Sequence, residues 1–117
     1  MSKTILIVED DKDIRENLKE LLESEGYDIE EAGNGKQALE RLKSMPVLPS
    51  LIFLDLMMPV MDGRALIKCM LEDERLKRIN VVVITAGAER IDAQISDFMK
   101  KPLDLDRVLE VAQKYCN

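Results

Sequence analysis

The sequence predicts an α/β fold, a doubly wound, five-stranded parallel sheet with helices on both faces. Short apolar runs alternate with amphipathic stretches along all 117 residues. The runs are apolar at consecutive positions, which is typical of strands buried on both faces. Strands that alternate with helices imply right-handed crossovers and a mostly parallel sheet. A chain of this length is expected to form one domain, residues 1–117.

In the first half of the chain, two strands and two helices alternate. Residues 4–8 are a continuous β-branched and apolar run, which predicts a buried strand. A helix should follow and end before Gly26. Its apolar side chains recur at helical spacing: Ile14, Leu18, Leu21 and Leu22. Residues 27–32 are richer in Asp and Glu, so this strand is expected at or near an edge. Asn34 and Gly35 then open a second helix.

The second half of the chain repeats this alternation. Residues 51–54 and 81–84 predict two more buried strands, and residues 63–71 predict a helix between them. Residues 98–99 mark a short fifth strand. A last helix should begin after Asp104 as its N-cap. Its inward-facing residues are expected to be Leu105, Val108, Leu109 and Ala112.

Composition excludes several classes of function. A net charge of −6 argues against binding to nucleic-acid phosphates, and four aromatic residues are too few for a base-stacking surface. The absence of histidine excludes imidazole catalysis by this chain. No apolar run could span a bilayer and no signal-peptide pattern is present, so a cytoplasmic protein without membrane insertion is expected. Cys69 and Cys116 should then be free thiols.

Polar side chains follow four of the predicted strands. The first strand is followed by Glu9, Asp10 and Asp11, the third by Asp55, the fourth by Thr85 and the fifth by Lys101. In parallel sheets, functional groups collect at the carboxyl ends of the strands. These side chains are therefore expected to converge at one edge, although Asp11 is better explained as the cap of the first helix.

Carboxylates from Glu9, Asp10 and Asp55 would repel one another in such a cluster. Two unit charges ~4 Å apart repel by roughly 4 kcal/mol at an effective dielectric constant near 20. A hard divalent cation would neutralise them, and few carboxylates with remaining waters suit Mg²⁺. Simpler interpretations exist: Asp10 as a helix cap, Asp55 as a turn initiator, Lys101 as an exposed lysine and Thr85 as a strand former. Convergence from four elements favours a shared site.

Four segments also match a family pattern: ILIVEDD at 5–11, LDLMMPVMDG at 54–63, VITA at 83–86 and DFMKKP at 97–102. In these segments the chain resembles the receiver domain of two-component response regulators, in the stand-alone form of chemotaxis regulators. The second segment is specific on its own, and the similarity runs essentially from end to end. The resemblance implies the flavodoxin-like strand order 2-1-3-4-5.

The resemblance implies a metal site and a phosphoacceptor. Asp55 would accept the phosphoryl group. Mg²⁺, for which Mn²⁺ could substitute, would be held by Glu9 through water, by Asp10, by Asp55 and by the backbone carbonyl of Met57.

The resemblance also implies residues that bind the phosphoryl group and report its presence. Thr85 and Lys101 would contact the phosphoryl oxygens. Phe98 occupies the position of the family's switch aromatic, which turns inward when Thr85 moves toward the phosphate. The Lys101–Pro102 bond would be cis.

The implied function is a phosphoacceptor signalling switch in a phosphorelay. Asp55 would take the group from a phosphohistidine of a histidine kinase or phosphotransfer protein, or from a small acyl phosphate, and later lose it by hydrolysis. Such a chain is not a conventional enzyme. The aspartyl phosphate would change a surface that an unidentified partner protein binds. No output domain is expected after the last helix, so output should come through that partner, with no direct nucleic-acid contact, unless the sequence is a fragment of a longer chain.

One departure and three alternatives qualify this resemblance. Residues 86–100 are too few for the family's usual fourth helix, which should be shortened around Ile91 and Ile95 or missing. A haloacid-dehalogenase-type phosphatase would need an Asp where Met57 stands. A flavodoxin-like electron carrier would need a Ser/Thr/Gly-rich loop after the first strand, not acids. The third alternative is a receiver-like interaction module that works without phosphorylation.

Overall fold

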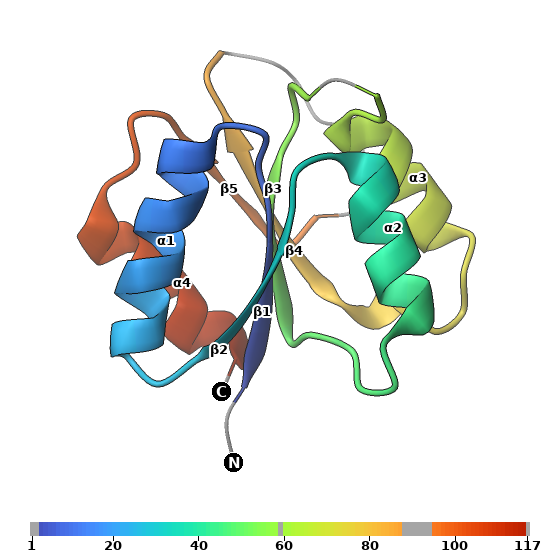
Figure 1. Cartoon of the computed structure of the whole chain (residues 1–117), viewed down its shortest axis with the longest axis horizontal. Coiled ribbons are helices and arrows are strands. Elements are labelled where there is room, and N and C mark those ends of the chain that lie inside the picture. Colours follow the sequence, from blue (N-terminus) through green and yellow to red (C-terminus); the bar gives the residue numbers. More distant parts are fainter. Residues whose placement is uncertain (1–2, 59, 88–94, 117) are drawn as a thin grey trace.

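A computed structural model describes residues 3–58, 60–87 and 95–116. Its centre is a sheet of five parallel strands in the predicted order, β2-β1-β3-β4-β5 (Figure 1). The strands are β1 (Thr4–Val8), β2 (Asp28–Ala32), β3 (Leu51–Asp55), β4 (Asn80–Thr85) and β5 (Asp97–Lys100). Strands β1 and β3 lie side by side with Val8 beside Leu54, so the segments that follow them leave the sheet together.

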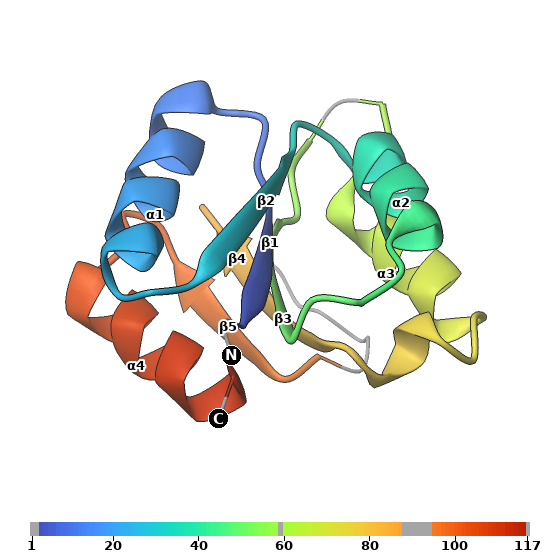
Figure 2. The same cartoon turned by 60° about the horizontal axis from the view of Figure 1, so that its bottom comes forward.

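Helices cover both faces of the sheet, α1 and α4 on one face and α2 and α3 on the other (Figures 1 and 2). Their bounds are α1 (Lys12–Ser24), α2 (Gly35–Ser44), α3 (Gly63–Leu71) and α4 (Leu105–Cys116), with a short 3₁₀ helix, η1 (Leu76–Arg78), after α3. The Asp11 side chain accepts hydrogen bonds from the backbone N–H groups of Asp13 and Ile14, so it caps α1 as predicted.

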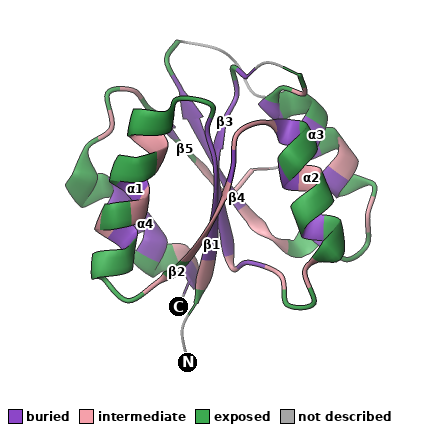
Figure 3. Cartoon of the chain, in the orientation of Figure 1, coloured by how far each residue is buried: buried purple, intermediate pink, exposed green. Residues whose placement is uncertain are grey.

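The central strands are buried (Figure 3), and the hydrophobic core forms two clusters, one on each face of the sheet. Successive residues of a strand point to opposite faces, so Ile5 and Ile7 pack toward α1 and α4, whereas Leu6 and Val8 pack toward α2 and α3. Phe53 lies fully buried in the cluster beneath α1 and α4. Burial on both faces explains the uninterrupted apolar runs of the central strands.

Strand β2, the chain between β4 and β5, and the last helix can each be compared with their predictions. Strand β2 is an edge strand, as predicted, and most of it is only half-buried. The predicted short helix around Ile91 falls within residues 88–94, outside the described residues. Ile95 is described; it is not helical and packs against the cluster that faces α2 and α3. The last helix continues to Cys116, four residues past Ala112. The prediction that Leu105 faces inward was wrong, because this first residue of α4 is 51% exposed.

Two further observations concern the helices and the cysteines. In the described ranges, none of the helices combines the length and the apolar character that a membrane span requires. Cys69 and Cys116 are both free thiols, as expected.

Candidate functional site

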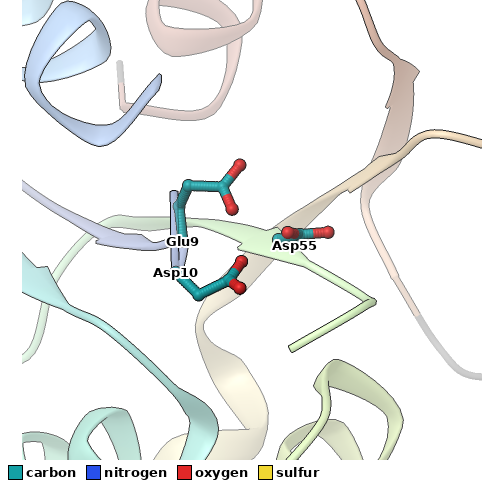
Figure 4. A group of neighbouring side chains, drawn as sticks. All are labelled: Glu9, Asp10 and Asp55. Carbon is teal, nitrogen blue, oxygen red and sulfur yellow. The ribbon is translucent and has the colours of Figure 1, made fainter. Parts of the chain in front are cut away.

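Three carboxylates from two neighbouring strands face one another at one edge of the sheet (Figure 4). Glu9 and Asp10 follow β1, and Asp55 ends β3. One carboxylate oxygen from each of the three residues lies within 4.8 Å of the other two. Glu9 and Asp55 are buried, while Asp10 is exposed. The structure therefore brings together the three acids expected from the sequence and leaves one side of the cluster open to solvent.

Lys101 brings a positive charge to the same cluster. It follows β5, and its backbone N–H donates to the carbonyl of Thr85 at 2.8 Å. Its Nζ lies 2.8 Å from Glu9 Oε1 and 3.3 Å from Asp55 Oδ2, so one ammonium bridges two buried acids. The bond from Lys101 to Pro102 is cis, as the resemblance implied.

Charge and burial shift the protonation of this cluster. Burial is the largest cause that raises the pKa of Glu9, from 4.5 to about 7, and a hydrogen bond and repulsion from Asp55 add to the rise. Lys101 and the backbone N–H of Asp11 oppose that rise. Burial acts to lower the pKa of the Lys101 ammonium, but its contacts with Glu9 and Asp55 outweigh burial and raise this pKa above its ordinary value. The ammonium therefore stays charged at neutral pH.

The acid cluster fits a hard divalent cation. Glu9 Oε1 is buried, and among the described residues the Lys101 ammonium is its ion-pair partner. Of the residues that the structure describes, none forms a hydrogen bond or an ion pair with the Asp10 carboxylate. Carboxylate oxygens that lie this close together are the ligands that Mg²⁺ prefers. Glu9, Asp10 and Asp55 are therefore a suitable set for that ion.

Asp55 combines the turn role and the cluster role that the sequence left as alternatives. Its Oδ1 accepts a hydrogen bond from the backbone N–H of Met57 at 3.1 Å, as expected of a turn-initiating Asp. Its Oδ2 lies toward Lys101. Met57 belongs to this turn and its side chain is exposed. The turn thus fixes the carboxylate orientation that the cluster uses.

Thr85 and Phe98 lie at the ends of the neighbouring strands. Thr85 is the last residue of β4, and its Oγ1 accepts a hydrogen bond from the backbone N–H of Gly87 at 3.2 Å. Its hydroxyl is thus held by the turn that follows β4. Phe98 lies on edge strand β5 beside Val83, and it is 53% exposed. The Phe98 ring is therefore turned outward.

Two glycines hold the segment after Asp55 against the helices α2 and α3. A Cβ on Gly63 would lie 2.8 Å from the carbonyl oxygen of Asp55 and 2.9 Å from Leu56 Cα, and these backbone atoms cannot move aside. Gly35 donates its backbone N–H to the Met61 carbonyl at 2.9 Å, and a Cβ there would overlap Met61. Close backbone approach at both points fixes the loop that carries Met57.

Sequence reasoning missed one residue that contacts this site. Arg15, on the first turn of α1, donates from Nη1 to the backbone carbonyl of Glu9 at 2.7 Å. Its Nε lies 3.4 Å from Glu31 Oε1 on β2. The available signal was a single arginine six residues after Glu9, in a segment otherwise rich in acids. Helical periodicity does not show that its side chain reaches back toward β1.

Comparisons with known proteins agree with this geometry. The family model of the response regulator receiver domain matches residues 5–113. The chain belongs to this family. Receiver domains are the signalling modules of two-component systems and are not conventional enzymes. The family assignment does not favour the phosphatase, electron-carrier or interaction-module alternatives.

The curated relatives include receiver domains alone and within longer proteins. An uncharacterized 14.6 kDa protein of Leptolyngbya boryana is 36% identical over 118 residues, which cover 96% of this chain and 88% of the relative. The polar-differentiation response regulator DivK of Brucella abortus is 28% identical, with 98% and 97% of the two chains covered. The CpxR homolog of Haemophilus influenzae, a transcriptional regulatory protein, is 37% identical, but this receiver spans only 47% of its length.

Solved structures show the same receiver fold. The receiver domain of a signal transduction histidine kinase from Syntrophus aciditrophicus has a TM-score of 0.90 and 30% identity, with 98% of this chain and 90% of that chain covered. A sensor histidine kinase receiver domain from Pseudomonas aeruginosa, with a magnesium ion coordinated in its active site cleft, has a TM-score of 0.89. It is 24% identical, with 99% and 98% of the two chains covered, so this likeness shows the fold.

Proposed function

We propose that this receiver domain, residues 1–117, is a phosphoacceptor switch in which Asp55 takes up a phosphoryl group. The observation that carries this proposal is the cluster of Glu9, Asp10 and Asp55, with carboxylate oxygens within 4.8 Å of one another. Three acids this close together repel one another and so destabilise the fold. A role in structural ion pairs alone therefore does not explain why the three acids lie together. Binding of a cation by the three acids, and transfer of a phosphoryl group to Asp55, would explain the cluster.

The residues of the chain supply distinct parts of the transfer. A carboxylate oxygen of Asp55 forms the bond to phosphorus as the bond between phosphorus and the donor's imidazole nitrogen breaks, and that nitrogen keeps the electron pair. Lys101, already 3.3 Å from Asp55 Oδ2, then pairs with the added negative charge. The Thr85 hydroxyl, which donates to the carbonyl of Gly87 at 3.4 Å, donates instead to a phosphoryl oxygen. Hydrolysis of the aspartyl phosphate resets the switch.

We propose that Glu9, Asp10, Asp55 and the backbone carbonyl of Met57 hold Mg²⁺, with Glu9 acting through water. When bound, the ion neutralises charge on the transferring group, and Mn²⁺ can take its place. The cluster geometry supports this assignment, and so does the magnesium found in the related receiver from Pseudomonas aeruginosa. No described residue other than Lys101 contributes a positive charge within ion-pair distance of Glu9 or Asp55.

The proposed output is a change of protein surface. When Thr85 moves toward the phosphoryl group, Phe98 turns inward from its exposed position on β5. A partner protein reads that change, and a histidine kinase or phosphotransfer protein supplies the phosphoryl group. We place this exchange in the cytoplasm, consistent with the free thiols of Cys69 and Cys116.

Exposure to acetyl phosphate and Mg²⁺ is expected to add one phosphoryl group to the protein, detected by intact mass. Asp55→Asn, which keeps the shape of the side chain but removes the nucleophile, is expected to show no adduct. The control Asp73→Asn changes a carboxylate after α3, outside the cluster, and is expected to be labelled normally. An unmodified native protein, or an undiminished adduct on Asp55→Asn, would favour an interaction module that works without phosphorylation.

Magnesium is expected to raise the melting temperature more at about pH 8 than at about pH 6. The pKa of Glu9 is raised to about 7 in the metal-free fold, so folding favours its protonated form. Glu9 therefore contributes stability that is full below its unfolded pKa and is lost as pH rises through 7. A cation must displace this proton at low pH but not at high pH. Thermal unfolding of native protein and Glu9→Gln would check this: the variant is expected to lose the pH dependence, and an equal magnesium effect in the native protein at both pH values would contradict it.

A further inference from the structure

Arg15 connects helix α1 to the segment that carries the acids. Its Nη1 donates to the carbonyl of Glu9 at 2.7 Å, across six positions of sequence. Glu31 on β2 holds the other side of the guanidinium, with Oε1 3.4 Å from Nε. Both side chains are partly buried, at 21% and 30% exposed, so this arrangement is partly shielded from solvent. A planar guanidinium with donors on two sides can hold both groups at a fixed angle.

The carbonyl that Arg15 binds has no partner in the sheet. The pairing of β1 with β3 ends at Val8 and Leu54, one residue before Glu9. The backbone N–H of Glu9 still donates to Ala32 at 3.1 Å, but its carbonyl lies beyond the ladder. A buried backbone carbonyl requires a donor, and a charged donor forms a stronger bond than a neutral one. Arg15 therefore fixes the plane of the Glu9–Asp10 peptide.

The Asp10 carboxylate depends on this peptide for its direction. Among the described residues, no hydrogen bond or ion pair engages the side chain, and it is the exposed member of the acid cluster. By contrast, Glu9 is held by Lys101, and Asp55 by Lys101 and by the turn at Met57. The orientation of Asp10 toward the other two acids is therefore set by its backbone.

We propose that Arg15 is a positioning residue, which aims the Asp10 carboxylate at the cation site by clamping the Glu9 carbonyl to Glu31. This inference rests on the proposed function, because it assigns Arg15 a role in metal binding at the same site. Groups that orient the ligands of a metal typically change metal affinity by about tenfold or more when removed. Loss of Arg15 is accordingly expected to weaken Mg²⁺ binding by about tenfold.

The sign of this effect separates positioning from simple electrostatics. Arg15 carries a positive charge near a cation site, so its charge alone opposes Mg²⁺ binding. If only charge mattered, its removal would tighten binding. The positioning role predicts the opposite, a higher Kd.

Lys19 provides a matched control on the same helix. Its Nζ lies 3.4 Å from Glu31 Oε2, so it shares the partner of Arg15, but it is not among the donors to the Glu9 carbonyl. Arg15→Met and Lys19→Met each remove one positive charge and keep an aliphatic stem. Arg15→Gln, whose shorter neutral amide cannot span from the Glu9 carbonyl to Glu31, replaces Arg15→Met if that variant does not fold.

The test is Mg²⁺ titration of the native protein and both variants, followed by two-dimensional NMR, which also gives the Asp10 amide signal without metal. We expect Arg15→Met to raise the Kd for Mg²⁺ about tenfold and to shift the metal-free Asp10 amide, with Lys19→Met close to native in both. An unchanged or lower Kd in Arg15→Met, or equal Asp10 shifts in the two variants, would overturn the inference. Failure of the native protein to bind Mg²⁺ would instead count against the proposed metal site itself, and the positioning role would fall with it.

Discussion

Lys101→Met is expected to lower the free energy of unfolding of the metal-free protein by about 3 kcal/mol. The Lys101 ammonium bridges Glu9 and Asp55, whose side chains are 0% and 4% exposed. Without this ammonium, two buried carboxylates face each other and lose the positive charge that bridged them. Burial of a charged group without a partner is costly. The partial exposure of Lys101, 21%, places the expected loss at the lower end of the range for buried pairs.

The loss in Lys101→Met should depend on pH and on metal. Lys101 is one of the groups that lower the pKa of Glu9, so its removal favours a protonated Glu9 still further. The variant should therefore lose less stability at about pH 6 than at about pH 8, and millimolar Mg²⁺ should restore part of the loss at the higher pH.

Urea unfolding measures both effects, with Lys100→Met as the control. Lys100 is the exposed neighbour of Lys101, and its replacement makes the same change in net charge. Its effect is expected to stay within about 0.5 kcal/mol. Equal losses in the two variants would show that the bridge contributes nothing beyond overall charge.

Phe53→Ala is expected to lower the free energy of unfolding by about 4 kcal/mol. Phe53 lies in central strand β3, is fully buried and packs in the cluster beneath α1 and α4. Truncation removes a large apolar surface and leaves a cavity that the surrounding strands and helices cannot fill by small shifts. Because small domains are stable by only about 5–15 kcal/mol, this single change should consume a large share of the total.

The chain offers a matched control for this prediction. Phe98 is the second of its two phenylalanines and is 53% exposed, so Phe98→Ala removes the same atoms from a partly solvated position. It is expected to cost less than about 1 kcal/mol. Urea midpoints and slopes of the two variants would check the comparison, and similar losses in both would contradict the buried position of Phe53.

Much of the fold follows from patterns that the sequence contains directly. Residues 4–8, 51–54 and 81–84 are apolar at every or almost every position because the strands are covered on both faces. Strand β2, exposed at an edge, has acids instead, and the predicted edge location is correct. The local pattern of apolar residues was sufficient to predict these strands, because that pattern reflects burial. Burial on both faces is in turn expected wherever strands alternate with helices.

The candidate site was predictable in part. The rule that carboxyl ends of parallel strands share an edge was enough to bring Glu9, Asp10 and Asp55 together. The bridge from Lys101 to Glu9 and the reach of Arg15 to the Glu9 carbonyl were not predicted, because both depend on side-chain conformation across elements distant in sequence. Local spacing contains no information on such contacts.

The division of the core into two clusters has a consequence for the site. Side chains of the same strands pack into both clusters, so we expect a substitution in either cluster to shift the strands that carry the site. Glu9 and Asp55 lie where the neighbouring strands β1 and β3 leave the sheet, so we expect their separation to change when either cluster is repacked. Affinity for the proposed cation is therefore expected to change on repacking of either cluster, before global unfolding occurs.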